Sequence, residues 1–214
     1  VLPSEAIALQ QRLKFFDGRL DEIGNEMNAR IKAEVAEINS IAQGIARLNN
    51  DIQAGFARTG GQPPNDLLDS RNEAVRQLSE LTGAQVVERG TSFDIYVGSG
   101  QPLVIGNTTN SLSMVASKTD PSRMSIQMDR GSSTIDITSV ISGGEIGGLL
   151  TYRKEVLDPS LNELGRVALV IADQINSQQA QGIDKNGDFG AAIFNNINSA
   201  ALISQRSIAK DGNS

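Results

Sequence analysis

The fold is decided by residues 13–52, which read LKFFDGRLDEIGNEMNARIKAEVAEINSIAQGIARLNNDI. Apolar side chains recur in this stretch at steps of three and four residues, which places them on one face of a helix. The pattern predicts one long helix, or two nearly collinear helices, over residues 4–53, with Ser4 as the N-cap. Because a helix of about 40 residues is roughly 60 Å long, we expect it to pack along another long helix.

A second apolar stripe with the same spacing predicts the partner helix over residues 145–181. Glycines precede it and Gly182 ends it, while Asp158-Pro159 predicts either a kink or a fresh start within it. We expect the two stripes to form an intramolecular packing seam, with the first helix facing the second along its length. The expected seam residues are Ile23, Met27, Ile31, Ile38, Ile45, Leu48 and Ile52 against Leu157, Leu161, Leu164, Ile171 and Ile175.

Between the stripes the sequence predicts a shorter helix and then a region of strands. Asn65 or Asp66 would cap the shorter helix, and Gly83 lies just past its end, where a left-handed residue is favoured. Over residues 85–141 the hydrophobic period changes to two, which is typical of half-buried strands. The turns between these strands are too short to hold crossover helices, so we expect an antiparallel meander.

The predicted fold class is therefore α+β. We expect an elongated bundle of long helices with a small antiparallel β-meander subdomain inserted between them. Residues 1–84 and 142–190 would form the helical rod domain, and residues 85–141 the β subdomain. Residues 191–214 would begin a further region, to which we assign no structure.

Composition excludes several classes of function. The chain has 214 residues, a net charge of -6, no His and no Cys. Without His and Cys it cannot form a Ser-His-Asp triad, a thiol nucleophile or a His/Cys zinc site. Scattered basic residues argue against nucleic acid or an anionic membrane as partners, and no apolar run approaches the roughly 18 residues that cross a bilayer. We therefore expect no catalytic residue and no cofactor, although a glycosidase that uses carboxylates alone is an alternative.

One loop offers a second alternative, a calcium-binding or surface-adhesion module. Asp184, Asn186 and Asp188 place oxygen side chains at alternate positions, as at the start of a calcium loop. That pattern requires Gly and Glu at the loop positions that hold Phe189 and Asn195 here. An Asx/Gly turn accounts for the same residues through backbone conformation alone.

Two blocks of sequence resemble the bacterial flagellar hook-associated protein 1 family. The first is PNDLLDSR at residues 64–71, and the second is GGEIGGLL at residues 143–150. The resemblance spans roughly residues 10–196, and one departure is Gln179, where members often carry His. It continues, in order and spacing, through Arg153, Leu157, Leu161, Leu164, Gly165, Asn176, Gly182, Asp184, Asn186, Gly187, Gly190 and Phe194.

The resemblance implies a structural subunit at the junction between the flagellar hook and the filament. Its expected partners are other copies of itself and neighbouring axial proteins, namely the hook protein and the second junction protein. Its expected location is the extracellular flagellum, after export by the flagellar secretion apparatus. The terminal helices typical of the family are absent from this sequence, so we expect an internal piece that is monomeric alone. Flagellin or another axial protein is the nearest alternative within this class.

Overall fold

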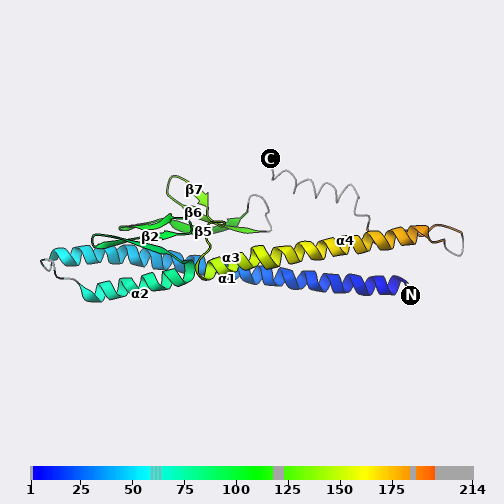
Figure 1. Ribbon diagram of the computed structural model, residues 1–214, viewed down its shortest axis with the longest axis horizontal. Coiled ribbons are helices and arrows are strands. Elements are labelled where there is room, and N and C mark those ends of the chain that lie inside the picture. Colours follow the sequence, from blue (N-terminus) through cyan, green and yellow to red (C-terminus); the bar gives the residue numbers. More distant parts are fainter. Residues whose placement is uncertain are drawn as a thin grey trace. The chain divides into compact units, whose positions relative to one another are not determined.

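The computed structural model describes residues 2–58, 60, 62, 64–117, 123–183 and 187–195 (Figure 1). Strands follow one long and one shorter helix, and a second long helical stretch follows the strands, which confirms the α+β class. The elements are α1 Leu2–Arg58, α2 Asn65–Thr82, β1 Gln85–Arg89, β2 Ser92–Val97, β3 Gln101–Ile105, β4 Thr108–Thr109, β5 Ser111–Ala116, β6 Met124–Asp129, β7 Thr134–Asp136, α3 Gly144–Tyr152, a π-helical turn Arg153–Leu157 and α4 Asp158–Gln181.

The chain divides into two compact units. The strand-bearing unit is Glu26–Arg153, and the helical unit comprises Val1–Asn25 with the chain from Lys154 onward. The β region thus shares a unit with part of α1, with α2 and with α3, whereas the sequence placed it in a subdomain of its own. The division falls inside α1, because the apolar stripe of α1 is covered by different elements along its length.

Helix α1 begins earlier and ends later than expected. It begins at Leu2, so the prediction of Ser4 as the N-cap is wrong. Pro3 fits the first turn because the N–H that proline lacks would have no helical partner there. The helix also continues past Gly55 to Arg58, whose positive charge in the last turn suits the helix dipole.

Helix α2 begins directly after Pro64. The Pro64 carbonyl accepts hydrogen bonds from the N–H groups of Leu67 and Leu68 at 3.0 and 3.1 Å, so neither Asn65 nor Asp66 is the N-cap. At the other end the prediction is confirmed. Gly83 has φ +64° and its N–H donates to the Ser79 carbonyl at 2.7 Å.

The strands form two antiparallel meanders rather than one. The first sheet has the order β1-β2-β3-β4 and the second has the order β5-β6-β7. The break follows β4, where the N–H of Asn110 turns back to the Leu103 carbonyl at 2.9 Å and ends the first sheet. Ser111 to Ala116 then pair with β6, with Leu112 opposite Met128.

In the strand-bearing unit, the later part of α1 lies between α2 and the two sheets (Figure 1). The core is aliphatic, as the low aromatic content predicts, and its largest side chains are almost fully buried. They are Ile31, Ile38, Ile45, Ile52, Leu78, Ile95, Leu103, Ile126, Met128, Ile137 and Ile146. This core holds the helices and both sheets in one body.

The second long helical stretch continues through Pro159, but a π-helical turn interrupts its α-helical structure just before that residue. Helix α3 passes into the π-helical turn Arg153–Leu157, and α4 then begins at Asp158 with Pro159 in its first turn. Proline removes one N–H donor from the helical ladder, and a π turn is one way for a helix to absorb that loss. Helix α4 ends before Gly182, as predicted.

Candidate functional site

The residues of the predicted seam divide between the two units. In the strand-bearing unit Leu48 is half-buried, whereas the remaining members are buried: Met27, Ile31, Ile38, Ile45 and Ile52. In the helical unit Leu157 is buried, whereas the remaining members are half-buried: Ile23, Leu161, Leu164, Ile171 and Ile175. The apolar positions of both helices are thus buried or half-buried, and their pairing in one seam stays a prediction.

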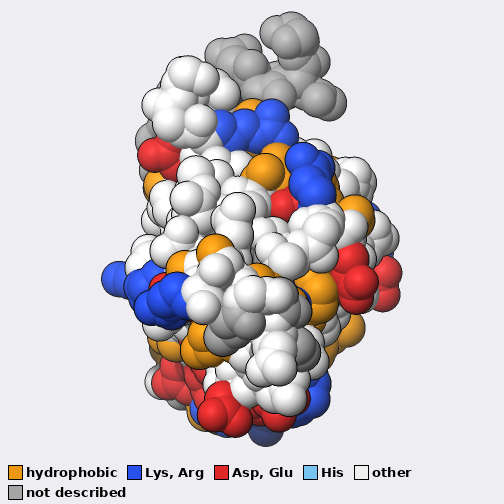
Figure 2. Space-filling model, turned by 90° about the vertical axis from the view of Figure 1, so that its left-hand side faces the viewer, with side chains coloured by type: hydrophobic (Ala, Val, Ile, Leu, Met, Phe, Trp, Pro, Cys, Tyr) orange, Lys and Arg blue, Asp and Glu red, His pale blue; other side chains and the backbone are white. Residues whose placement is uncertain are grey.

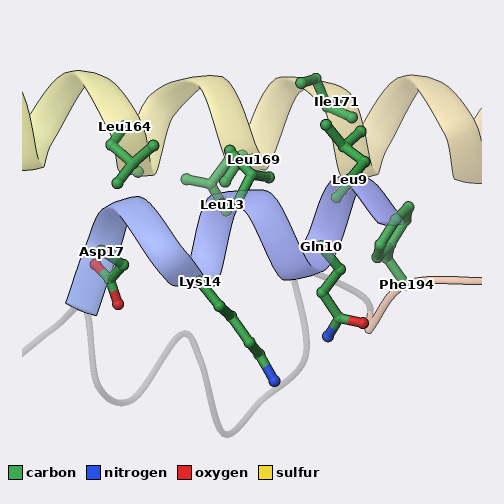
Figure 3. Close-up of a pocket in the computed structure, with 12 residues that line it drawn as sticks. Leu9, Gln10, Leu13, Lys14, Asp17, Leu164, Leu169, Ile171 and Phe194 are labelled. Carbon is green, nitrogen blue, oxygen red and sulfur yellow. The ribbon is translucent and has the colours of Figure 1, made fainter. Parts of the chain in front are cut away.

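Within the helical unit, α4 runs antiparallel to the first turns of α1. A Cβ on Gly24 would lie 3.6 Å from Cδ2 of Leu157, at the start of α4. Further along, Leu164 and Ile171 lie across a groove from Leu13 and Leu9 (Figure 3). In this unit α1 faces α4 from Leu9 to Gly24, so Ile23 is the α1 member of the predicted seam that lies within it. Apolar spacing shows which side of a helix turns inward, but it does not show which element covers that side.

The groove between these two helices has a volume of about 330 Å³. Its floor is apolar, and Lys14 and Asp17 of α1 lie along its edge (Figure 3). Phe194 closes one end, next to Leu9. No described residue of α4 is fully buried, so this helix pair leaves much of its apolar surface open.

A buried asparagine joins α1 to the first sheet. Asn49 is 1% exposed, and its Nδ2 donates to the carbonyls of Phe93 and Gly106 at 2.8 and 2.7 Å. Its Oδ1 accepts from the N–H of Phe93 at 3.0 Å. One amide side chain therefore satisfies both backbone groups of Phe93 in the way that a neighbouring strand would. This contact fixes where the first sheet sits on α1.

Arg71 of α2 completes the same polar cluster. Its Nη1 donates to Oδ1 of Asn49 at 3.1 Å and to the Thr91 carbonyl at 2.7 Å, and its Cζ lies 3.6 Å from the centre of the Phe93 ring. Burial lowers the pKa of the Arg71 guanidinium, and nearby Glu88 opposes this effect. The aromatic face stabilises a cation that has left water. Three elements, α1, α2 and the β1–β2 hairpin, thus meet at one cluster.

A second buried charge stabilises the turn that follows β3. Asp94 is fully buried, and its Oδ1 accepts from the N–H of Gly106 at 2.8 Å. Its Oδ2 pairs with the exposed Arg89 at 2.9 Å. Since the Gly106 carbonyl also accepts a hydrogen bond from Asn49 Nδ2, Asp94 and Asn49 together bind both backbone polar groups of that turn residue.

A second asparagine joins α1 to the second sheet. Asn39 Nδ2 donates to the Leu112 carbonyl at 2.8 Å, and the N–H of Leu112 donates to Asn39 Oδ1 at 2.8 Å. Asn39 and Asn49 are ten residues apart, or about 2.8 helical turns, so their side chains leave α1 in directions about 80° apart. Each sheet is therefore attached to α1 by one asparagine that pairs with both backbone groups of one strand residue. We call Asn39 and Asn49 the asparagine clamps.

Charged residues join α1 to α3. Arg30 lies 3.3 Å from Glu34 on its own helix and also pairs with Glu145 in the first turn of α3. Arg153 of the π turn donates to the side chain of Asn28. Glu34 is 6% exposed, and burial raises the pKa of its carboxyl although Arg30 opposes the effect.

Replacing this buried carboxylate should stabilise the fold at neutral pH. Because the pKa of Glu34 is higher in the folded chain, its contribution to stability is complete below the unfolded pKa and is lost as pH rises through the folded value. Glu34→Gln should therefore be more stable than the parent at pH 7, by about 1 kcal/mol or less, and the difference should shrink toward pH 4. Urea unfolding at both pH values measures this.

Glu37→Gln is the matched control, since Glu37 is exposed one turn away. It removes the same charge from the same helix without removing a buried carboxylate. A Glu34→Gln difference that is constant between pH 4 and pH 7 would contradict the prediction.

Glycines allow the end of α2 to cross the start of α3. The distance from a Cβ on Gly144 to the Leu81 carbonyl carbon and to the Thr82 nitrogen would be 2.4 Å, and Gly144 has φ +67°. A Cβ on Gly83 would lie 2.8 Å from Cα of Gly143. The contact is backbone against backbone, so no side chain can move aside to admit a methyl group. The GG at residues 143–144 therefore has a packing role in this unit.

A side-chain amide also fastens the segment that follows α4. Gly190 donates its N–H to the Gly182 carbonyl at 3.0 Å, and Ile183 bridges to Phe189. Asn176 Oδ1 accepts from the N–H groups of Ile193 and Phe194, both at 2.9 Å, and its Nδ2 donates to the Phe194 carbonyl at 2.9 Å. Asn176 therefore places Phe194 at the end of the groove.

Removing the Asn176 side chain should release this segment. Asn176→Ala deletes three hydrogen bonds at a partly buried position, each worth about 1 kcal/mol net. The Ile193 and Phe194 amides should then exchange with deuterium at least about tenfold faster, while the α1 amides should be unchanged. Asn162→Ala, at an exposed position of α4, is the control. Equal exchange in the two variants would show that Asn176 does not hold the segment.

The structure offers no metal centre among the residues that it describes. There, no group of three or more His, Cys, Asp or Glu side chains could hold a metal ion. Of the candidate calcium residues, Asp184 and Asn186 lie outside the described residues, and Asp188 is exposed. Gly187 has φ +89°, a conformation that favours glycine.

Surface charge and hydropathy add two observations. The face seen in Figure 2 carries Lys/Arg and Asp/Glu side chains of both signs rather than one basic patch. Over the described part of the chain, no helix is both long and apolar enough to cross a membrane.

Sequence reasoning missed the asparagine clamps and the role of Arg71. One sequence pattern could have indicated Asn39 and Asn49. Each is a polar residue next to an apolar position of the α1 stripe, and the two are nearly three helical turns apart. That signal is weak because a solvent-facing asparagine produces it equally well. Arg71 stood at the end of the first family-like block, but sequence alone did not show that it is 4% exposed.

The geometry can be compared with known proteins. A family model described as the flagellar hook-associated protein FlgK helical domain matches residues 1–194. The chain is 35% identical over 196 residues to flagellar hook-associated protein 1 of Salmonella typhimurium and 36% identical over 189 residues to that of Escherichia coli K12, which covers 90% and 87% of this chain. The solved flagellar hook junction protein FlgK from Burkholderia pseudomallei matches 89% of this chain with a TM-score of 0.82 and 35% identity.

These matches cover only part of each relative. The chain spans 35% of the length of the Salmonella and Escherichia proteins and 35% of the Burkholderia chain. The similarity therefore extends over almost all of this sequence but over about a third of those proteins.

Proposed function

The chain belongs to the FlgK family of flagellar hook-associated proteins, and on that premise we propose that it is a structural part of the junction between hook and filament. The family match over residues 1–194 is the observation that carries this proposal. The polar side chains that it buries, such as Asn49 and Arg71, bind the chain's own backbone, which suits a scaffold. We propose accordingly that it acts by packing and not by catalysis.

The proposed partners are other copies of the same protein and the neighbouring axial proteins, namely the hook protein and the second junction protein. The proposed location is the flagellum outside the cell, reached through the flagellar export apparatus. We propose too that residues 1–214 alone are monomeric, which sedimentation equilibrium would test. A heterologous contact repeated around a helical axis builds a tube.

Deletion of this segment from the whole gene tests the function. Cells that carry the deletion should form hooks without filaments and shed flagellin into the medium, as scored by electron microscopy and by immunoblotting of the medium. Complementation with the intact gene should restore filaments. Normal filaments in the deletion strain, with the shortened protein detected at its usual level, would refute a junction role for this segment.

The glycosidase and calcium alternatives lead to different results. A calcium-binding module would show a thermal shift with calcium that vanishes with EDTA, and an enzyme would show turnover of a glycan. Neither alternative predicts hooks that lack filaments.

A further inference from the structure

The chain passes between its two units at two places, and both lie inside helical segments. One place is in α1, between Asn25 and Glu26, and the other follows Arg153 in the π-helical turn. Any bending of one unit against the other must therefore bend helical backbone at these two places. The local structure at each place decides how easily this happens.

The second crossing has a weakened helical ladder. Residues Arg153–Leu157 form a π turn, which directly follows the end of α3. Pro159 has no N–H, so it cannot make the helical bond to the carbonyl of residue 155. The hydroxyl of Ser160 donates to the Val156 carbonyl at 2.7 Å, a side-chain bond of the type that bends helices. Prolines and π turns are the usual causes of sharp helix kinks.

The first crossing carries a glycine that packing does not require. Gly24 lies two residues before the division, and a Cβ there would meet Leu157 at 3.6 Å, an ordinary contact distance. Alanine would thus fit, yet glycine costs about 1 kcal/mol in a helix relative to alanine. What glycine supplies at this position is a backbone that bends more easily.

In each unit, a side-chain contact joins the two helical segments close to the places where the chain passes between the units. In the strand-bearing unit, Arg153 bonds to Asn28. In the helical unit, Leu157 lies against Gly24. Bending is therefore confined to the short stretches next to these two contacts, residues 24–28 on α1 and residues 153–159 through the π turn and Pro159.

We propose that Gly24 and the π turn with Pro159 form a paired hinge, at which the helical unit bends against the strand-bearing unit. Bending at these two weak points lets each unit move as a rigid body while its own core stays packed. The hinge is a property of the chain itself. Its use, to let a subunit follow a bending hook while joined to a stiffer filament, rests on the proposed function.

Double electron–electron resonance tests the hinge directly, because it measures the distribution of distances between two spin labels. Since the sequence contains no Cys, labels attach only at introduced cysteines. The full 214-residue chain would carry labels on Asn72→Cys of α2 and Asn162→Cys of α4, both at exposed positions in different units. Asn72→Cys with Lys32→Cys gives a reference pair within the strand-bearing unit. The distance distribution should be at least about twice as broad for the pair that spans the units.

Two double variants test whether the hinge residues cause the broad distance distribution of the pair that spans the units. Gly24→Ala combined with Pro159→Ala should narrow the spanning distribution to about half its width or less and leave the reference pair unchanged. Gly18→Ala with Gly165→Ala adds helix-forming residues at two positions where nothing lies within 4 Å of the new methyl, and it should change neither distribution. Circular dichroism confirms that each variant is folded.

Two results would overturn the hinge. One is a spanning distribution in the parent as narrow as the reference pair, and the other is a spanning distribution that the Gly24/Pro159 variant leaves unchanged. Neither result would touch the junction role, which the deletion strain tests by filament attachment. Conversely, normal filaments in that strain would leave a measured hinge intact but remove the use proposed for it.

Discussion

Gly144→Ala is expected to lower the free energy of unfolding by about 3 kcal/mol or more. The φ of +67° costs an L-residue roughly 1–2 kcal/mol, and forcing a methyl group into close-packed surroundings costs about 1–3 kcal/mol. The new Cβ would lie 2.4 Å from backbone atoms of Leu81 and Thr82, which cannot turn aside as a side chain can. Urea unfolding followed by circular dichroism measures the loss.

Two control variants separate the causes. Gly90→Ala places alanine at a similar φ, +61°, with nothing within 4 Å of its Cβ, so it carries the conformational cost alone. Gly148→Ala, one turn after Gly144, has open space and an ordinary helical position, and it should stabilise the chain by up to about 1 kcal/mol. If Gly144→Ala loses no more stability than Gly90→Ala, the crossing of α2 and α3 does not depend on the missing Cβ.

The same crossing shows what the sequence could and could not predict. The GG at residues 143–144 predicted a break before a helix, and the structure has one there. That the break touches the end of α2 follows only from the path of the strands between them, which local patterns do not encode. The change in the spacing of apolar residues likewise predicted strands correctly within residues 85–141. Side chains of a strand alternate between its faces, so a strand buried on one face has an apolar period of two.

Contacts between distant segments were harder to predict. The stripe on α1 is continuous in the sequence, yet Leu13 faces α4 while Ile45 belongs to the core of the strand-bearing unit. Both are apolar residues at the same helical spacing, so nothing local distinguishes them. The attachment of the second sheet to α1 includes Asn39, which binds Leu112 at a separation of 73 residues. Pairings over such a distance are set by the whole fold.

Asn49→Ala is expected to have the largest effect of any single polar substitution in the strand-bearing unit, a loss of about 4 kcal/mol. It leaves the N–H and the carbonyl of Phe93, the carbonyl of Gly106 and one donor of Arg71 without the partner that each has now. A buried polar group without a partner costs about 1–3 kcal/mol, and part of that cost returns if water enters. Asn50→Ala, on the exposed side of the same turn, should change stability by less than about 0.5 kcal/mol.

A double-mutant cycle then asks whether the asparagine and the arginine act together. Arg71→Met keeps most of the side-chain volume but removes the donors to Asn49 and Thr91 and the cation over Phe93. Since Arg71 and Asn49 share a hydrogen bond, the double variant should lose less stability than the two single variants combined, by about 1 kcal/mol or more. Additive losses would mean that α2 and the first sheet attach to α1 independently. A sub-additive loss would mean that one cluster joins all three elements. A substitution on α2 would then also weaken the attachment of the first sheet to α1.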